Sequence, residues 1–328
     1  VSAVAGRLFG RRAAMMALWL AALCPFTANY VAAPLTETLS LACIAVAFYG
    51  LERWRTTALG VNRWLWAITF ALAYAVLLRP EQGLLAAAVL GAMLWISSRG
   101  RDWRRSVWPV AVAAVCMVLP LAPWAVRNWR TFHVIQPLAP RSATDPGELE
   151  PLGFQRWYGT WGIDFASTED VYWNYDGAEI DISDIPSRAF DSEEQYEQTN
   201  ALLNDYNQTD NATAAIDARF EKIAEQRIQD DPVRYYVALP VARLVNMMFR
   251  PRTEMMPIPL YWWHWEHPGK SWFAAGYAAL NLAYFVLAGV GFWLWRRRGW
   301  DGNPALARSM MGFVLLRCTV LLTLDKWE

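Results

Sequence analysis

The sequence lacks the loops with which many enzymes bind nucleotides or activate a serine. It contains no G-x-x-x-x-G-K-[ST] segment, and no glycine-rich loop follows a strand-like run. It also contains no G-x-S-x-G turn, which would present a nucleophilic serine. These absences argue against a nucleotide-binding domain and against a serine hydrolase built on such a turn.

The sequence contains few cysteines, and its positive and negative residues balance. The formal net charge is +0, which argues against nucleic acid as a partner, because binding it requires a basic face. Every cysteine lies inside an apolar run without the close spacing of a metal site, so we interpret all four as small hydrophobic residues without disulfides. They are Cys24, Cys43, Cys116 and Cys318.

Apolar residues, in contrast, are abundant. Hydrophobic residues make up 55% of the chain, and 20 residues are tryptophan. A membrane span needs about 20 consecutive apolar residues, and seven runs reach or approach that length. The sequence therefore predicts an all-α polytopic membrane protein with about seven transmembrane helices. The runs are 13–33, 35–51, 64–79, 82–98, 107–126, 271–295 and 304–324.

Arginine clusters in alternate short segments predict the orientation. Such clusters favour the cytoplasmic side of a membrane. If all four arginine clusters face the cytoplasm, the seven predicted spans cross the membrane in alternating directions without conflict. Residue 34 and segments 79–81 and 127–270 then face outward, and we expect the chain in the cytoplasmic (inner) membrane. The clusters are Arg7, Arg11 and Arg12; Arg53, Arg55 and Arg63; Arg99, Arg101, Arg104 and Arg105; and Arg296, Arg297, Arg298 and Arg308.

The predicted domains are 1–126 with five spans, 127–270 as a mostly helical extracytoplasmic domain, and 271–328 with two spans. Between Arg141 and Val233 lie 21 acidic and six basic residues, with many tryptophans and tyrosines. The aromatic residues favour a folded domain over a disordered acidic loop. We expect helices at 189–205 and 212–230, the second with an apolar stripe of Ile216, Phe220 and Ile223, and a short strand at 178–182.

The segment 233–250 is apolar, but a span there would place the last arginine cluster on the wrong side. We therefore predict a helix lying at the outer interface, broken by Pro240, with Arg234 and Arg243 reaching toward the lipid headgroups.

Ionisable residues at the ends of spans are candidates for function, and the first two clusters lie near the predicted outer surface. Glu37 opens a span between Thr36 and Thr38, where the alternative is a carboxylate that only stabilises a helix N-terminus. Arg79 and Glu81 lie in the next outer turn. An arginine there is suited to a lipid phosphate, although an Arg–Glu pair that only closes the turn is the alternative.

Two further clusters lie on the same predicted side. Arg127 and Asn128 end a span, where a cation also favours a helix C-terminus. The second cluster, residues 249–267, offers sugar or acceptor contacts, although its tryptophans also suit a membrane interface. Its candidates are Arg250, Arg252, Glu254, Trp262 and Trp263, with His264, Glu266 and His267 as weak metal ligands whose spacing fits no firm motif.

Short stretches in the N-terminal part resemble the integral-membrane GT-C glycosyltransferases. They are Phe9-Gly10-Arg11-Arg12, Thr36-Glu37-Thr38-Leu39, Leu77 to Gly83, and Pro123 to Trp129. The set most similar to this chain is the dolichyl-phosphate-mannose-protein mannosyltransferase-like set, also called glycosyltransferase family 39 or the aminoarabinose-transferase-like set. The resemblance covers about residues 1–135 well and the C-terminal spans loosely.

This resemblance implies inverting transfer of a hexose or pentose from a polyprenyl-phosphate donor to an acceptor hydroxyl outside the cytoplasm. It assigns a functional acid to Glu37 and places Arg79 and Arg127 near the donor phosphate. We expect Asn128 beside that phosphate as well, and Glu81 among the possible sugar or acceptor contacts. It implies no firm cofactor, with a divalent metal as the one candidate. The other partners are membrane lipid and an acceptor that is a glycan, a lipid or a protein.

The family's main catalytic Asp precedes the segment with which this sequence starts, and another arginine follows the segment with which it ends. We therefore expect a chain truncated at both ends, without the main catalytic Asp. Two alternatives belong to other classes. A transporter or flippase of a lipid-linked glycan predicts charges deep within the spans, whereas only Arg317 lies there. A non-catalytic, membrane-anchored binding protein predicts that Glu37 and Arg127 are dispensable.

Overall fold

The structure is a computed structural model. It describes residues 1–32, 36–57, 59–99, 103–133, 135, 137–138, 149–175, 177–209 and 212–323. Residue 34, Arg101 and Arg141 lie outside these ranges, as do the side chains of Arg104 and Arg105.

The chain is an all-α membrane protein, and its described residues form helices and no strand. It divides into two compact units. The first comprises residues 1–143 and 288–317, and the second comprises residues 144–287 and 318–328. The long helix α14 (Pro268–Arg297) contributes to both units.

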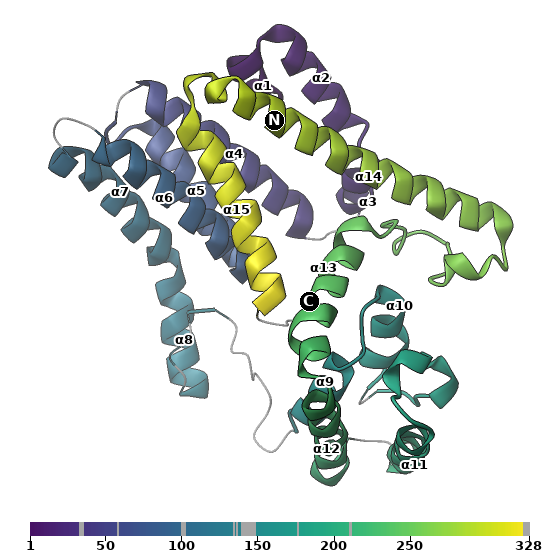
Figure 1. Cartoon of the computed structure of the whole chain (residues 1–328). Coiled ribbons are helices and arrows are strands. Elements are labelled where there is room, and N and C mark those ends of the chain that lie inside the picture. The colour runs from purple at the N-terminus through teal and green to yellow at the C-terminus, as the bar shows by residue number, and fades with distance from the viewer. Residues whose placement is uncertain are drawn as a thin grey trace. The chain divides into compact units, whose positions relative to one another are not determined.

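In the first unit, α4, α5, α6 and α7 pack against one another (Figure 1). Ser309 on α15 donates a hydrogen bond to the Ala88 carbonyl oxygen on α6 at 3.0 Å. The helices of this unit are α1 (Ser2–Phe9), α2 (Arg11–Ala22), α3 (Pro25–Ala32), α4 (Thr36–Thr57), α5 (Arg63–Leu78), η1 (Pro80–Gln82), α6 (Gly83–Ser98), α7 (Trp103–Val118), η2 (Leu119–Leu121), α8 (Ala122–Phe132), η8 (Gly299–Gly302) and most of α15 (Pro304–Thr323).

Helices α4 and α5 form a closely packed antiparallel pair. A Cβ atom on Gly50 would lie 2.7 Å from Ile68 Cγ1, so only glycine permits this approach of α4 to α5. Trp54 is fully buried near the end of α4 and donates from Nε1 to the Gly60 carbonyl oxygen at 2.9 Å. The pair therefore holds the start of α4 close to the end of α5.

Four helical segments among the described residues are long and apolar enough to cross a membrane. They are Pro80–Ser98, Val107–Phe132, Pro268–Arg297 and Pro304–Thr323, with Arg63–Leu78 as a shorter apolar helix. The predicted count of seven stays a prediction. The predicted run 13–33 consists of two helices, because α2 ends at Ala22 and α3 begins at Pro25, where proline favours a helix start.

The second unit contains the acidic segment and the start of α14. Its helices are α9 (Leu152–Gly159), α10 (Phe165–Ser167), the π-helix η3 (Thr168–Tyr172), η4 (Ile182–Asp184), η5 (Ser187–Ala189), α11 (Glu193–Thr209), α12 (Ala214–Asp230), the π-helix η6 (Arg234–Ala238), α13 (Leu239–Phe249) and η7 (Trp262–His264). The two predicted helices correspond to α11 and α12.

An aromatic core holds the second unit together. Phe154 stacks on Tyr175 with ring centroids 3.7 Å apart, and Tyr175 stacks on Tyr206 at 4.9 Å. The predicted stripe Ile216, Phe220 and Ile223 packs into this core, which also buries Trp157, Tyr158 and Trp161. The segment thus has a buried aromatic core, although Trp173 is exposed.

The strand predicted at 178–182 is absent from this described segment. The Asn207 side chain on α11 instead bonds both backbone groups of Ile180, each at 3.1 Å, and so replaces a neighbouring strand. The break predicted at Pro240 was also wrong. The π-helix η6 runs directly into α13, because the wider turn accommodates a proline that has no N–H.

Candidate functional site

Glu37, Arg79 and Glu81 come together at one end of the first unit. Glu37 lies in the first turn of α4, and Arg79 follows the last residue of α5. Arg79 Nη2 donates to Glu37 Oε1 at 3.0 Å, and Arg79 Nε lies 3.6 Å from Glu81 Oε1. All three side chains are partly exposed. Because α4 and α5 are antiparallel, their packing brings together a carboxylate and a guanidinium that are distant in sequence.

Three oxygen atoms, on Glu37 and on residues near this pair in sequence, are buried and have no hydrogen-bond partner among the described residues. They are Glu37 Oε2, Ser40 Oγ and Gln82 Oε1. Ser40 lies three residues after Glu37 on α4, and Gln82 directly follows Glu81 in η1. A buried polar atom without a partner costs about 1–3 kcal/mol, so this end of the unit is suited to receive a hydroxyl or another polar group. Sequence reasoning missed Ser40 and Gln82, which are polar residues at the ends of otherwise apolar helices.

Arg127 and Asn128 lie on α8 and differ in exposure. Asn128 is fully buried, and its Nδ2 donates to the Leu138 carbonyl oxygen at 2.5 Å. Arg127 is exposed and donates from Nη1 to Asn128 Oδ1 at 3.2 Å. Its guanidinium also lies 5.7 Å from the Trp124 ring centroid and 5.5 Å from that of Phe132. Asn128 thus orients Arg127, and within the described ranges no carboxylate neutralises that guanidinium.

The predicted acceptor contacts Arg250, Arg252 and Glu254 belong to the second unit and bond mainly to one another and to backbone. Arg250 Nε lies 2.6 Å from Glu254 Oε1, and the Arg250 guanidinium lies 4.8 Å from the Phe165 ring centroid. Arg252 has a φ of 64° and donates to the Met247 carbonyl oxygen at 2.5 Å. On α14, Asn281 caps the last turn of α13 by donating to the Met248 carbonyl oxygen at 2.7 Å. Sequence reasoning missed this amide, which is buried within an apolar helix.

The tryptophan-rich stretch forms an aromatic cluster around Tyr261. Trp262 is half-buried, Trp263 is exposed, and His264 stacks on Tyr261 with centroids 5.2 Å apart. Burial raises the pKa of Tyr261, and its hydroxyl donates to Asp170 at 2.6 Å. His264, Glu266 and His267 are exposed. In the described part of the chain, no three His, Cys, Asp or Glu side chains are grouped to hold a metal ion, so a divalent metal stays a prediction from the resemblance.

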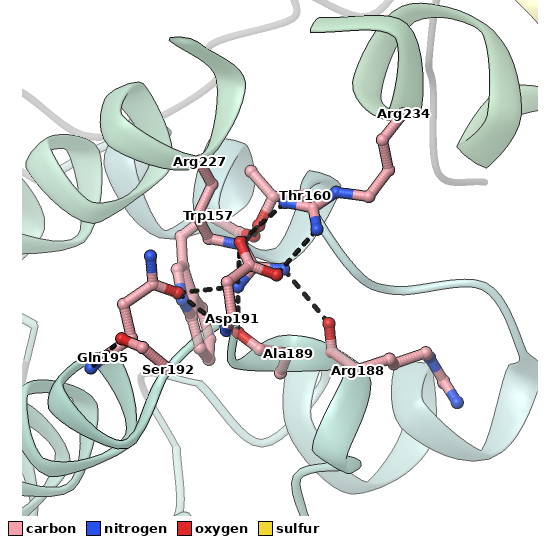
Figure 2. Close-up of polar contacts among 9 residues, drawn as sticks. All are labelled: Trp157, Thr160, Arg188, Ala189, Asp191, Ser192, Gln195, Arg227 and Arg234. Atoms are coloured by element: carbon pink, nitrogen blue, oxygen red, sulfur yellow. Dashed lines mark hydrogen bonds and ion pairs between the residues drawn. The ribbon is translucent and has the colours of Figure 1, made fainter. Parts of the chain in front are cut away.

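Polar contacts surround a fully buried arginine, Arg227, in the second unit (Figure 2). Arg227 donates to Thr160 Oγ1 at 2.9 Å, to Gln195 Oε1 at 2.9 Å, and to the carbonyl oxygens of Ala189 at 2.6 Å and Arg188 at 3.1 Å. It also lies 3.1 Å from Asp191 Oδ2. Burial lowers the pKa of Arg227 to about 10, so it stays charged at neutral pH.

The two arginines expected to reach toward lipid headgroups bind the second unit instead. Arg234 forms a two-bonded ion pair with Asp191, at 2.6 and 2.8 Å. Arg243 donates to the carbonyl oxygens of Gly159 and Gly162. The segment also carries an exposed apolar stripe of Val233, Val237, Val241, Val245 and Phe249.

A comparison with known protein families, together with the apolar helices, supports a membrane glycosyltransferase of the GT-C type. Residues 1–126 match the model of the family described as dolichyl-phosphate-mannose-protein mannosyltransferase, so the resemblance to that family is confirmed. The matched part contains Glu37, Arg79 and Glu81, and it ends directly before Arg127. No curated protein and no solved structure matches the chain.

Proposed function

We propose that this protein transfers a sugar from a polyprenyl-phosphate donor to an acceptor hydroxyl, with inversion, on the extracytoplasmic face of the inner membrane. The observation that carries the proposal is the Glu37 carboxylate. Arg79 fixes one of its oxygens, and the other is buried and has no partner within the described part of the chain. A carboxylate held in this way is suited to accept the proton of a hydroxyl.

The proposed reaction forms a bond between the acceptor oxygen and the anomeric carbon of the sugar. The bond between that carbon and the phosphate oxygen breaks, and the polyprenyl phosphate leaves with the electron pair. The hydroxyl proton passes to Glu37. Arg127 stabilises the departing phosphate, because its guanidinium is exposed and has no carboxylate partner among the described residues.

The other candidates receive supporting roles. Arg79 orients Glu37, and Asn128 orients Arg127, since each contacts its neighbour directly. Ser40 and Gln82 offer buried oxygens to the acceptor. Glu81, Arg250, Arg252, Glu254, Trp262 and Trp263 remain proposed contacts of the sugar or acceptor.

The test uses the protein expressed in membranes from its complete reading frame and incubated with polyprenyl phosphates that carry radioactive sugars. Release of sugar from the lipid is measured for the wild type, Glu37→Gln and Arg127→Ala, with Arg130→Ala as a control on the same helix. Loss of release in the first two variants alone supports the proposal. No release by folded wild type across several donors would favour a transporter, and full release by both variants would overturn the roles proposed for Glu37 and Arg127.

A further inference from the structure

Two tryptophans at one end of the first unit are each flanked by two arginines. The Arg53 and Arg63 guanidiniums both lie 4.9 Å from the Trp64 ring centroid. Cations are attracted to the face of an indole ring, which explains one such contact at each ring. It does not explain why two like charges gather at the same ring.

The second tryptophan, Trp95, repeats the arrangement with residues from different helices. Arg99 follows the last residue of α6, and its guanidinium lies 4.1 Å from the Trp95 ring centroid. Arg308 on α15 approaches the same ring at 4.5 Å. We call the groups Arg53–Trp64–Arg63 and Arg99–Trp95–Arg308 the two Arg–Trp–Arg clusters.

The four arginines of these clusters lack the counter-charge that neighbouring arginines have. At the same end of the unit, Arg55 Nε lies 3.4 Å from Glu52 Oε2, and Arg7 Nε lies 4.0 Å from Glu52 Oε1. Across the ranges that the structure describes, no carboxylate pairs with any arginine of the two clusters. Two guanidiniums held near one ring repel each other unless an anion lies nearby.

The Trp64 cluster also contains buried donors without acceptors. Arg53 Nε and Trp64 Nε1 are both buried and have no hydrogen-bond partner among the residues that the structure describes. Each of these N–H groups is a donor only. What the cluster lacks is therefore an acceptor, and an anionic oxygen would satisfy its charge and its hydrogen bonds together.

The clusters lie where the apolar helices end. The span Pro80–Ser98 has 19 residues, which corresponds to about 28 Å of helix, close to the hydrocarbon thickness of a bilayer. Arg99 follows it directly, so its side chain is placed at the level of the lipid headgroups. Residue 80 adjoins Arg79, and the Trp95 cluster is therefore at the opposite end of α6 from the Glu37–Arg79 pair.

We propose that the two Arg–Trp–Arg clusters bind the phosphate groups of anionic phospholipids, in the leaflet opposite the candidate catalytic pair. Each guanidinium donates to phosphate oxygens in a planar fork. The tryptophan ring holds the arginines in place and lies at the depth where indoles favour a membrane interface. The position at the end of a span favours a lipid phosphate over a free phosphate ion. The proposal does not depend on transferase activity.

The test measures phosphatidylglycerol binding to the purified protein in mild detergent by native mass spectrometry, with phosphatidylcholine as the neutral lipid. The variants are Arg99→Gln/Arg308→Gln and Arg53→Gln/Arg63→Gln. Each basic residue near an anionic membrane surface contributes about 1 kcal/mol, so each double variant should weaken binding at its own cluster about thirtyfold. The matched control is Arg11→Gln/Arg12→Gln, which removes the same amount of charge from two exposed arginines without a ring contact.

The controls separate this proposal from its alternatives. Preference for phosphatidylglycerol over phosphatidylcholine, lost in the cluster variants and kept in the control, supports it. Equal weakening in the control would overturn it in favour of general charge attraction, and displacement of the lipid by millimolar inorganic phosphate would overturn it in favour of a simple anion site. If a glutamine variant does not fold, Arg99→Lys/Arg308→Lys keeps the charge but not the fork. Unchanged lipid binding in that variant would overturn the assignment to paired guanidiniums.

Discussion

Arg227 in the second unit and Arg127 in the first unit use their guanidiniums in opposite ways. Arg227 is fully buried, and oxygen atoms from four other residues accept its hydrogen bonds. Arg127 is exposed, and one amide and two rings hold it. Moving a charge out of water costs several kcal/mol unless its partners are complete. A buried arginine with complete partners therefore serves the fold, whereas an oriented arginine without an anion is suited to bind one.

The largest effect should come from removing the buried charge. Arg227→Leu leaves four oxygen acceptors in the second unit without this donor, and it should lower the free energy of unfolding by about 3–5 kcal/mol. The measurement is thermal unfolding followed by tryptophan fluorescence. Arg219 on the same helix pairs with Asp205 on the surface, so Arg219→Leu should cost at most about 1 kcal/mol. Equal losses in the two variants would contradict the structural role of Arg227.

The second prediction concerns the acid of the first unit. Glu37→Gln keeps the shape of the side chain but removes the base, so the rate of sugar transfer should fall about a hundredfold or more. The unfolding temperature should change little, because the side chain is partly exposed. Rate and unfolding temperature are measured on the same preparation. A large fall in unfolding temperature would instead place Glu37 with Arg227 as a structural group.

The third prediction compares two arginines on α8. Arg127→Gln should slow transfer by roughly tenfold to a hundredfold, because it removes a positive charge from the departing phosphate. Arg130 also lies on α8 and is exposed, yet Arg130→Gln should leave the rate near that of the wild type. Equal rates for the two variants would show that the orientation of Arg127 by Asn128 has no functional meaning.

The smallest effect should be a dependence of stability on pH. The hydrogen bonds from Arg234 lower the pKa of Asp191. An aspartate whose pKa is lowered in the folded state stabilises the fold above its unfolded pKa of about 3.9, and this contribution is lost as the pH falls through the folded pKa. Between about pH 6 and about pH 3, the unfolding temperature should therefore fall less in Asp191→Asn than in the wild type. Asp205→Asn, on the exposed pair, should behave as the wild type does.

The sequence predicted local features well because they depend on neighbouring residues. The apolar runs located the helices, and the stripe of Ile216, Phe220 and Ile223 identified the buried face of α12. The family model matches residues 1–126, which agrees with the resemblance drawn from short sequence motifs in that part of the chain. Where a helix pauses at a proline, as between Ala22 and Pro25, the run of apolar residues did not reveal the break.

The remaining features depend on residues that are far apart in the chain. Arg227 is one of six bases in an acidic segment, and its burial follows from partners at positions 160 and 188–195. The pairing of Glu37 with Arg79 requires the antiparallel packing of α4 and α5. The Asn207 side chain bonds the backbone of Ile180 in place of a neighbouring strand, and the periodicity of apolar residues does not predict this contact. These choices are set by tertiary contacts, which single-residue patterns do not encode.

The close approach at Gly50 determines more than local packing. Two antiparallel helices can slide along each other, and this sliding is restricted most where their backbones come nearest. Gly50 is 13 residues after Glu37 on α4, or about 20 Å along the helix. A side chain at position 50 would press on Ile68 and shift one helix against the other, so that the carboxylate at one end would no longer meet its guanidinium. The absence of a side chain at Gly50 thus helps to set the distance between Glu37 and Arg79, about four helical turns away.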